Sequence, residues 1–167
     1  MIDVAILGAG ELGGSIAHVL ARRGRVHRIQ LIDPAGQVAA GKALDICQTA
    51  PVEGFTTPVR GTTDLSRVAG SHLVIVADQA KPQADADDLL RLTQISELAS
   101  QAVVLCAGAE GRTLVERGVR ELRYGRARLF GSAPEALVAG VRALVALQAQ
   151  CSVRDVDRKS TRLNSSH

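Results

Sequence analysis

The feature that most constrains this chain is a glycine pattern near its start, between an apolar run and a helical pattern. Ile2 to Leu7 is a short apolar run typical of a strand, and Glu11 to Arg23 has helical spacing. The turn between them, together with Gly13, gives the pattern Gly-x-Gly-x-x-Gly. Such a turn lets the backbone approach a pyrophosphate at a helix N-terminus, where unpaired amides and the helix dipole favour negative charge. The apolar residues that share one face of this helix are Leu12, Ile16, Val19 and Leu20.

An acidic residue follows at the distance that dinucleotide sites use. Asp33 ends a second predicted strand, Arg28 to Asp33, twenty residues beyond Gly13. A carboxylate there can accept hydrogen bonds from both ribose hydroxyls of an adenosine, and it would repel a 2′-phosphate. The next residues, Pro34-Ala35-Gly36, offer no arginine to bind that phosphate. The sequence therefore predicts NAD rather than NADP, while FAD stays open because the same fingerprint serves flavin.

Each member of the glycine pattern has a physical role. Gly8 permits the tight turn, Gly10 lets the backbone approach a pyrophosphate, and Gly13 lets the helix pack close to the sheet. The free amides of Glu11 and Leu12 would face the phosphates. We nominate no catalytic residue and no metal ligand. The candidate cofactor contacts are Gly8, Gly10, Glu11, Leu12, Gly13, Asp33 and, at the end of a later apolar run, Ala77.

Strand-like and helix-like segments alternate along the rest of the chain. Two apolar runs, Ser71 to Ala77 and Ala102 to Ala107, are bounded by turn signals, as in strands covered on both faces of a parallel sheet. Parallel neighbours need crossover connections, which the helical patterns supply. We therefore predict one α/β domain over residues 1–157, a Rossmann-type doubly wound parallel sheet with helices on both faces. The remaining predicted elements are helices at 36–49, 85–100, 113–123 and 134–150 and strands at 56–61 and 127–130.

The charge of the chain argues against a nucleic-acid partner. The formal net charge is +3, but residues 158–167 carry three of the twenty basic side chains and no acidic one. The other seventeen basic side chains balance seventeen acidic ones, and aromatic residues, which stack on bases, are only 2%. The polar run KSTRLNSSH resembles translated adapter sequence, so we expect a disordered tail that is a cloning artefact, with a natural polar terminus as the alternative.

Compartment and metal binding follow from the cysteines and histidines. Neither a membrane span nor a basic, cleavable leader is evident. The three cysteines are odd in number and widely spaced, which is typical of reduced, mostly buried thiols in a cytoplasmic protein. The four histidines are scattered and form no ligand set with them, so no metal site is predicted.

Longer motifs give the chain a resemblance to the malate and lactate dehydrogenases. Besides GAGELGGSIAHVLA, these are GKALDI at Gly41 to Ile46, APVEGF at Ala50 to Phe55, GTTDL at Gly61 to Leu65 and AGSHLVIVA at Ala69 to Ala77. The resemblance covers about residues 1–157 and implies the NAD-binding half of such an enzyme. The family's second half carries the catalytic histidine in a His-Gly-Asp context, and that segment has no counterpart here.

The resemblance fails where substrate would bind. The family's loop after the fourth strand follows AG-x-PR-x-PG-x-SR-x-DLL, whose two arginines grip the substrate, whereas this chain has ADQAKPQADADDLL. Lys81 stands near the first arginine and Ala86 at the second. Lysine cannot reproduce a bidentate guanidinium clamp, and Asp85, Asp87 and Asp88 would repel a dicarboxylate.

Later family positions also differ. The family's TNP turn corresponds to Cys106-Ala107-Gly108. Leu137 and Gly140 stand where the family has an Asp that orients the histidine and an Arg that binds the substrate carboxylate. Arg142 lies two positions further, about 200° around a helix, and so would face away. The alternative is that Arg142 or Lys81 takes over substrate binding.

Three functions stay open. The first is the NAD-binding domain of a malate/lactate dehydrogenase-like oxidoreductase, which transfers hydride between NAD and a 2-hydroxy acid, with this chain alone inactive. The second is a non-catalytic, dinucleotide-binding paralogue used for regulation or assembly. The third is a dehydrogenase for an unusual 2-hydroxy substrate contacted by Lys81. Family members commonly associate through their second helix and the long apolar helix, so the resemblance also implies a homo-oligomer.

Overall fold

A computed structural model of the chain describes residues 1–81, 88–108 and 111–156. Its six strands form one sheet in the order β3-β2-β1-β4-β5-β6, and every neighbouring pair is parallel. This is the strand order of the doubly wound dinucleotide-binding fold, so the predicted fold class is confirmed. The strands are β1 (Ile2–Leu7), β2 (Val26–Ile32), β3 (Val59–Thr62), β4 (Leu73–Val76), β5 (Val103–Cys106) and β6 (Leu129–Gly131).

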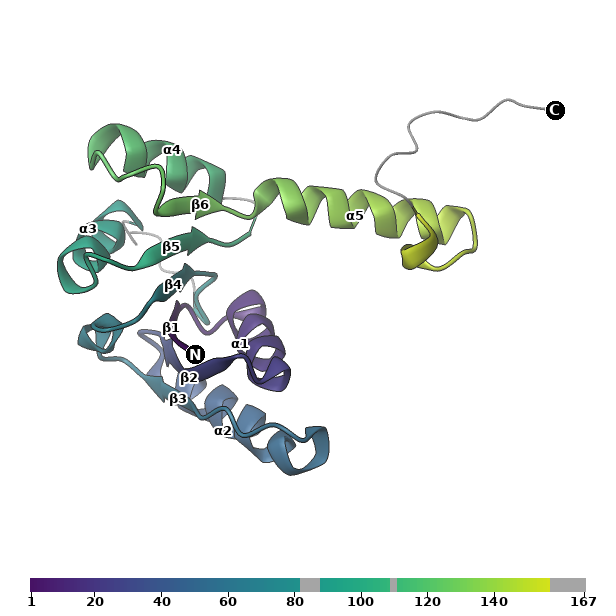
Figure 1. Cartoon of the computed structure of the whole chain (residues 1–167), viewed down its shortest axis with the longest axis horizontal. Helices are drawn as coiled ribbons and strands as arrows, with labels where there is room; N and C mark the ends of the chain where they lie inside the picture. The colour runs from purple at the N-terminus through teal and green to yellow at the C-terminus, as the bar shows by residue number, and fades with distance from the viewer. Residues whose placement is uncertain (82–87, 109–110, 157–167) are drawn as a thin grey trace.

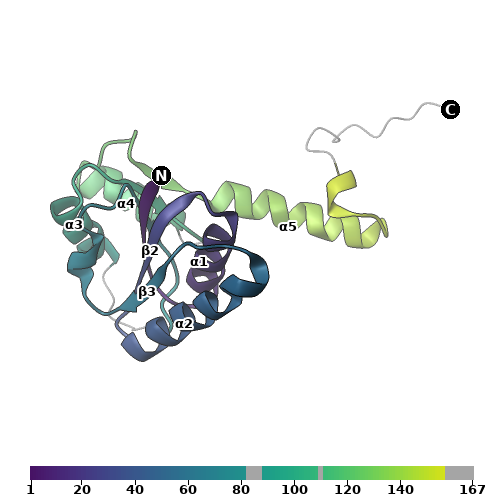
Figure 2. The same ribbon diagram turned by 60° about the horizontal axis from the view of Figure 1, so that its bottom comes forward.

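Helices cover both faces of the sheet (Figures 1 and 2). Side chains alternate along β1, so that Val4 and Ile6 enter one core cluster while Ala5 and Leu7 enter the other. The first cluster includes residues of α1 and α2, and the second includes residues of α3 and α4. The helices are α1 (Glu11–Arg23), α2 (Gly36–Glu53), α3 (Asp88–Leu98), α4 (Gly111–Glu121) and α5 (Ala133–Gln148), with 3₁₀ turns η1 (Leu65–Val68) and η2 (Val153–Asp155).

The face that α1 buries matches the predicted apolar face only in part, since Ile16 and Leu20 are half-buried against the core. Gly13, Ala17 and Ala21 are its buried residues, whereas Leu12 and Val19 are 37% and 43% exposed. Small side chains let the helix axis lie close to the sheet, and larger ones at these positions would hold it away. The close approach brings the N-terminus of α1 against the ends of β1 and β4.

Helix α2 continues past the proline that we expected to end it. It runs to Glu53 with Pro51 inside its last turn, and Gly54 ends it with a left-handed φ of 73°. The Gly54 N–H donates to the Ala50 carbonyl, which closes the helix as a glycine C-cap commonly does. Proline tends to break a helix by removing one donor, but near the C-terminus that loss is small beside the packing of the turns before it.

Most other boundaries lie within three residues of those predicted. Strand β1 and helix α1 have the predicted bounds, while β2 begins earlier, at Val26, and β3 later, at Val59. The predicted start of the helix at 85–100 and the acidic positions 85 and 87 lie outside the described residues, as does the predicted tail at 158–167.

Helix α5 extends away from the sheet (Figures 1 and 2) and packs against η2. Only Ala133 and Ala146 of this helix are buried. Its large apolar side chains are exposed, from 39% at Val138 to 77% at Leu147. No helix among the described residues is long and apolar enough to cross a membrane.

Candidate functional site

The predicted site residues gather at one edge of the sheet, where the parallel strands end. The turn of Gly8 and Gly10 follows β1, Asp33 follows β2, and Ala77 follows β4. Strands β1 and β4 are neighbours here, and the chain leaves them toward opposite sides, so this is the position where doubly wound sheets bind ligands. The structure thus brings together all seven residues that the sequence nominated.

The glycine turn has the packing that its pattern predicts. Gly8 has a φ of 109°, a backbone conformation that residues other than glycine rarely adopt. A Cβ there would collide with the Ala77 and Asp78 carbonyls. A Cβ on Gly13 would collide with the Gly8 carbonyl, because the first turn of α1 lies directly on the loop. The tight turn and the close helix packing are therefore both present, and Ala77 contributes its backbone to the same contact.

Asp33 is almost completely buried within the site, with 1% of the residue exposed. Oδ2 accepts the Ala9 N–H at 2.7 Å and the Ala80 N–H at 2.9 Å, while Oδ1 accepts the Ala35 N–H at 2.8 Å. Three amide donors compensate the burial of this charge. Asp33 consequently ties the glycine turn to the segments that follow β2 and β4.

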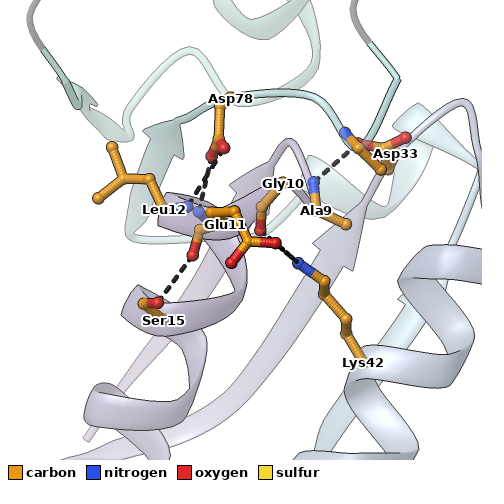
Figure 3. A network of polar contacts seen from close by, with 10 residues as sticks. Ala9, Gly10, Glu11, Leu12, Ser15, Asp33, Lys42 and Asp78 are labelled. Atoms are coloured by element: carbon orange, nitrogen blue, oxygen red, sulfur yellow. Dashed lines mark hydrogen bonds and ion pairs between the residues drawn. The ribbon is translucent and has the colours of Figure 1, made fainter.

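A second carboxylate, which the sequence analysis did not nominate, lies on the N-terminus of α1 (Figure 3). Asp78 Oδ1 accepts the Gly13 N–H at 2.9 Å, and Oδ2 accepts the Leu12 N–H at 3.2 Å. Its main-chain carbonyl also accepts the Gly10 N–H at 3.0 Å. The Leu12 amide, which we expected to be free for phosphate, therefore has a carboxylate partner, because an anion at this position complements the helix dipole.

A cation from α2 reaches the same turn. Lys42 Nζ donates to the Gly10 carbonyl at 2.7 Å and lies 3.8 Å from a Glu11 carboxylate oxygen, as Figure 3 shows. The Glu11 side chain is fully exposed, so solvent screens this ion pair and it adds little stability. Lys42 sits in the GKALDI motif, so its proximity to the turn could have been suspected from the resemblance but not from the residue pattern.

A cavity of about 190 Å³ opens beside the glycine turn. It is smaller than the roughly 300–1,000 Å³ of a pocket that takes a whole drug-sized ligand, so it can hold one end of a dinucleotide. Residues from the ends of three strands, from η1 and from α3 line it: Leu7, Gly8, Ile32, Pro34, Thr63, Leu65, Gln79, Arg91 and Gln94.

The positions where the resemblance expects substrate-binding groups do not form a substrate site among the described residues. Lys81 is exposed, and Leu137 on α5 is 68% exposed. Gly140 faces open space, and Arg142 donates to the Val153 carbonyl at 3.0 Å, away from the strand ends. Position 86 lies outside the described residues.

The thiol of Cys106, at the end of β5, is unreactive. Cys106 is 1% exposed, and burial, with a smaller effect of the Asp88 charge, raises its pKa to about 12. It is therefore a neutral thiol at physiological pH and is no nucleophile. The prediction of mostly buried thiols holds for Cys106 alone, since Cys47 is half-buried and Cys151 is exposed; all three are free.

The histidines of the described segments lie away from the strand ends that carry the site. His18 pairs with Glu53 at 3.0 Å, and His27 pairs with Asp3 at 2.8 Å near the start of the sheet. The Asp3 N–H donates to His72 Nδ1 at 3.1 Å. Within residues 1–81, 88–108 and 111–156, no group of three or more His, Cys, Asp or Glu side chains could hold a metal ion.

Comparison with known proteins matches this chain to a family of enzymes. The family model described as lactate/malate dehydrogenase, NAD binding domain, matches residues 2–115. A malate dehydrogenase of Thioalkalivibrio sulfidiphilus (strain HL-EbGR7) is 32% identical over 168 residues, which is 94% of this chain and 55% of that protein. The chain therefore spans about half the length of this relative.

Solved structures agree in fold. The malate dehydrogenase of Salinibacter ruber superposes with a TM-score of 0.80 at 23% identity, over 93% of this chain and 52% of that one. A lactate dehydrogenase of Cryptosporidium parvum, complexed with lactic acid and nicotinamide adenine dinucleotide, superposes with a TM-score of 0.75 at 21% identity, over 93% and 52%. At these identities the likeness establishes the shared fold alone.

Proposed function

The chain belongs to the lactate/malate dehydrogenase family through its NAD-binding domain, and on that premise we propose that it is the dinucleotide-binding part of an oxidoreductase acting on a 2-hydroxy acid. The family assignment agrees with the NAD cofactor predicted from Asp33. The observation that carries the proposal is the glycine turn after β1, which the buried Asp33 at the end of β2 holds in place. When bound, NAD would supply the hydride acceptor or donor, and this chain's residues would hold and orient it.

The nucleoside end of the cofactor fits the cavity best. Apolar side chains of Ile32, Pro34 and Leu65 offer walls for a flat ring, and Asp33 is the neighbour in sequence of the first two. Its negative charge disfavours a 2′-phosphate, so NADH should bind at least tenfold more tightly than NADPH. The pyrophosphate fits less well, because the Asp78 carboxylate already holds the amides of Leu12 and Gly13.

Dinucleotide binding can be tested by filling the cavity from its rim. Thr63 is exposed and lines the cavity, so Thr63→Trp should lower the affinity for NADH at least tenfold while leaving the melting temperature unchanged. Thr56→Trp is the matched control, because Thr56 is also exposed but does not line the cavity. Isothermal titration of the full chain would measure both. If both variants kept wild-type affinity for NADH, the cavity would not be the NADH site. If the folded wild type did not bind NADH at all, the proposal would be refuted.

A second candidate function, dinucleotide binding without catalysis, has specific support. Proton transfer to or from the substrate hydroxyl needs a base near the cofactor, and the described histidines pair elsewhere. Leu137 and Gly140 on α5 also lack the charged groups that the family resemblance implies, and Lys81 stands where the family's loop has an arginine. We therefore expect this chain to bind NADH without oxidising malate or lactate. Appearance of NADH absorbance with NAD and either acid would contradict this reading.

The proposal also covers the self-association of this chain and its cellular compartment. The large apolar side chains of α5 are exposed, from 39% at Val138 to 77% at Leu147, which supports a homo-oligomer. Sedimentation equilibrium would show a dimer or larger species, and a monomer at micromolar concentration would oppose it. The three free cysteines support a reducing compartment such as the cytoplasm.

A further inference from the structure

The N-terminus of α1 carries an anion supplied by the chain itself. Gly10 is the N-cap residue, and it has no side chain to accept the first amides of the helix. Asp78, distant in sequence, takes that role by accepting from Leu12 and Gly13, the second and third residues of α1. An N-cap side chain normally serves these same positions. The carboxylate therefore completes the helix with the kind of charge that the dipole attracts.

The same carboxylate occupies the space that a pyrophosphate would need. A Cβ added to Gly10 would collide with the carboxylate of Asp78, so the gap left by the missing side chain is already filled. The Gly10 N–H also donates to the Asp78 carbonyl at 3.0 Å, which fixes this residue over the turn through its main chain. A phosphate approaching Gly10 would have to displace the carboxylate from both amides.

Local charge does not offset this obstacle. Lys42 brings a positive charge to the turn, where Nζ already donates to the Gly10 carbonyl, and Arg91, which lines the neighbouring cavity, is paired with Asp88 at 3.3 Å. The Glu11 and Asp78 carboxylates add two negative charges around it. A bound pyrophosphate would therefore stand close to Asp78 even after the side chain turned into solvent, and like charges at such distances repel.

We propose that Asp78 is an intramolecular competitor for pyrophosphate, which lowers the affinity of the site for dinucleotides and leaves its affinity for the nucleoside end unchanged. This inference rests on the proposed dinucleotide function and deepens it, because it names the residue that sets the affinity and the ligand group against which it acts. A tethered carboxylate competes at a high effective concentration, so the effect persists at any protein concentration.

The experiment compares full-length wild type with Asp78→Asn and Asp78→Ala by isothermal titration. Asn removes the charge and keeps an oxygen that can accept one amide, whereas Ala also empties the space. Glu97→Gln is the control, because it removes one exposed acidic charge from α3 without touching the turn. Three titrants separate the parts of the ligand: NADH, adenosine and inorganic pyrophosphate. Circular dichroism verifies that each variant is folded.

The proposal expects NADH and pyrophosphate to bind at least tenfold more tightly to both Asp78 variants than to wild type and the control. Adenosine should bind all four proteins within twofold. Unchanged or weaker NADH binding in the Asp78 variants, with adenosine binding intact, would overturn the competitor role and leave the proposed function standing. If no variant bound either NADH or adenosine, the proposed function would fail, and the inference with it.

Discussion

Asp33 should contribute more to folding than its family role in ribose binding requires. Asp33→Ala removes the acceptors of three N–H groups, those of Ala9, Ala35 and Ala80. An unsatisfied buried donor costs about 1–3 kcal/mol. Ala9 is fully buried, while Ala35 and Ala80 are half-buried and can regain part of their hydrogen bonding from water. Summing one full and two partial penalties, we expect a loss of about 3 kcal/mol in the free energy of unfolding.

Urea denaturation followed by circular dichroism measures this loss directly. Asp33→Asn restores one acceptor oxygen, so its cost should lie between those of wild type and Asp33→Ala. Asp45→Ala is the control: Asp45 is exposed on α2, and its replacement should change stability by less than about 0.5 kcal/mol. If Asp33→Ala lowered the free energy of unfolding by less than about 1 kcal/mol, with the slope against urea concentration unchanged, the assigned cost of the three unpaired N–H groups would be refuted. It follows that lost NADH binding in Asp33→Ala cannot by itself identify a ribose contact.

Further predictions concern pH and packing. The hydrogen bond from His27, and to a smaller extent the Arg28 charge, lower the pKa of Asp3 below its ordinary 3.8. The ionised carboxylate therefore stabilises the fold above pH 3.8, and this stabilisation is lost as the pH falls through the lowered pKa of the folded state. The melting temperature of Asp3→Asn should therefore lie below that of wild type at pH 7, and the difference should close below pH 3.8; a gap that does not change with pH would contradict the assignment. Gly61→Ala should cost about 2 kcal/mol or more in urea unfolding, because its Cβ would meet the α2 backbone at Ala39. Gly24→Ala, at a φ of 60° in open space, should cost about 1 kcal/mol; equal costs would show that close packing does not matter at Gly61.

Local sequence patterns were sufficient to predict the fold, the glycine turn and the position of Asp33. A strand, a glycine turn and a helix follow one another so tightly that β1 and α1 have their predicted bounds. The alternation of apolar runs with helices left a parallel sheet as the consistent arrangement. The place of Asp33 at the end of β2 followed from its spacing to Gly13. The bounds of β1 and α1, the parallel sheet and the position of Asp33 all depend on residues that are close together in the sequence, so they can be predicted from local sequence patterns.

The features that the sequence did not reveal depend on contacts across the fold. Asp78 caps α1 from 66 residues away, and no local pattern links it to Leu12. A signal did exist in the resemblance, because Asp78 stands where the family's loop has the glycine of its AG pair. The buried face of α1 was predicted only in part for a related reason. Apolar periodicity favours large side chains and found Ile16 and Leu20, whereas close helix packing selected Ala17 and Ala21. Helix α2 passed Pro51 because Gly54, rather than the proline, ends it.

The central claim is that NADH binds at the glycine turn where β1, β2 and β4 end, with its nucleoside end in the cavity that reaches Thr63 after β3. Amide chemical-shift mapping tests this claim most directly. The chain is small enough, at 17.5 kDa, for two-dimensional amide spectra during titration with NADH. The account predicts the largest shifts in the glycine turn at 8–13 and around Asp33 and Thr63, with little change near Asp3 at the opposite edge of the sheet. Shifts centred near Asp3, or no shifts at saturating NADH, would contradict it.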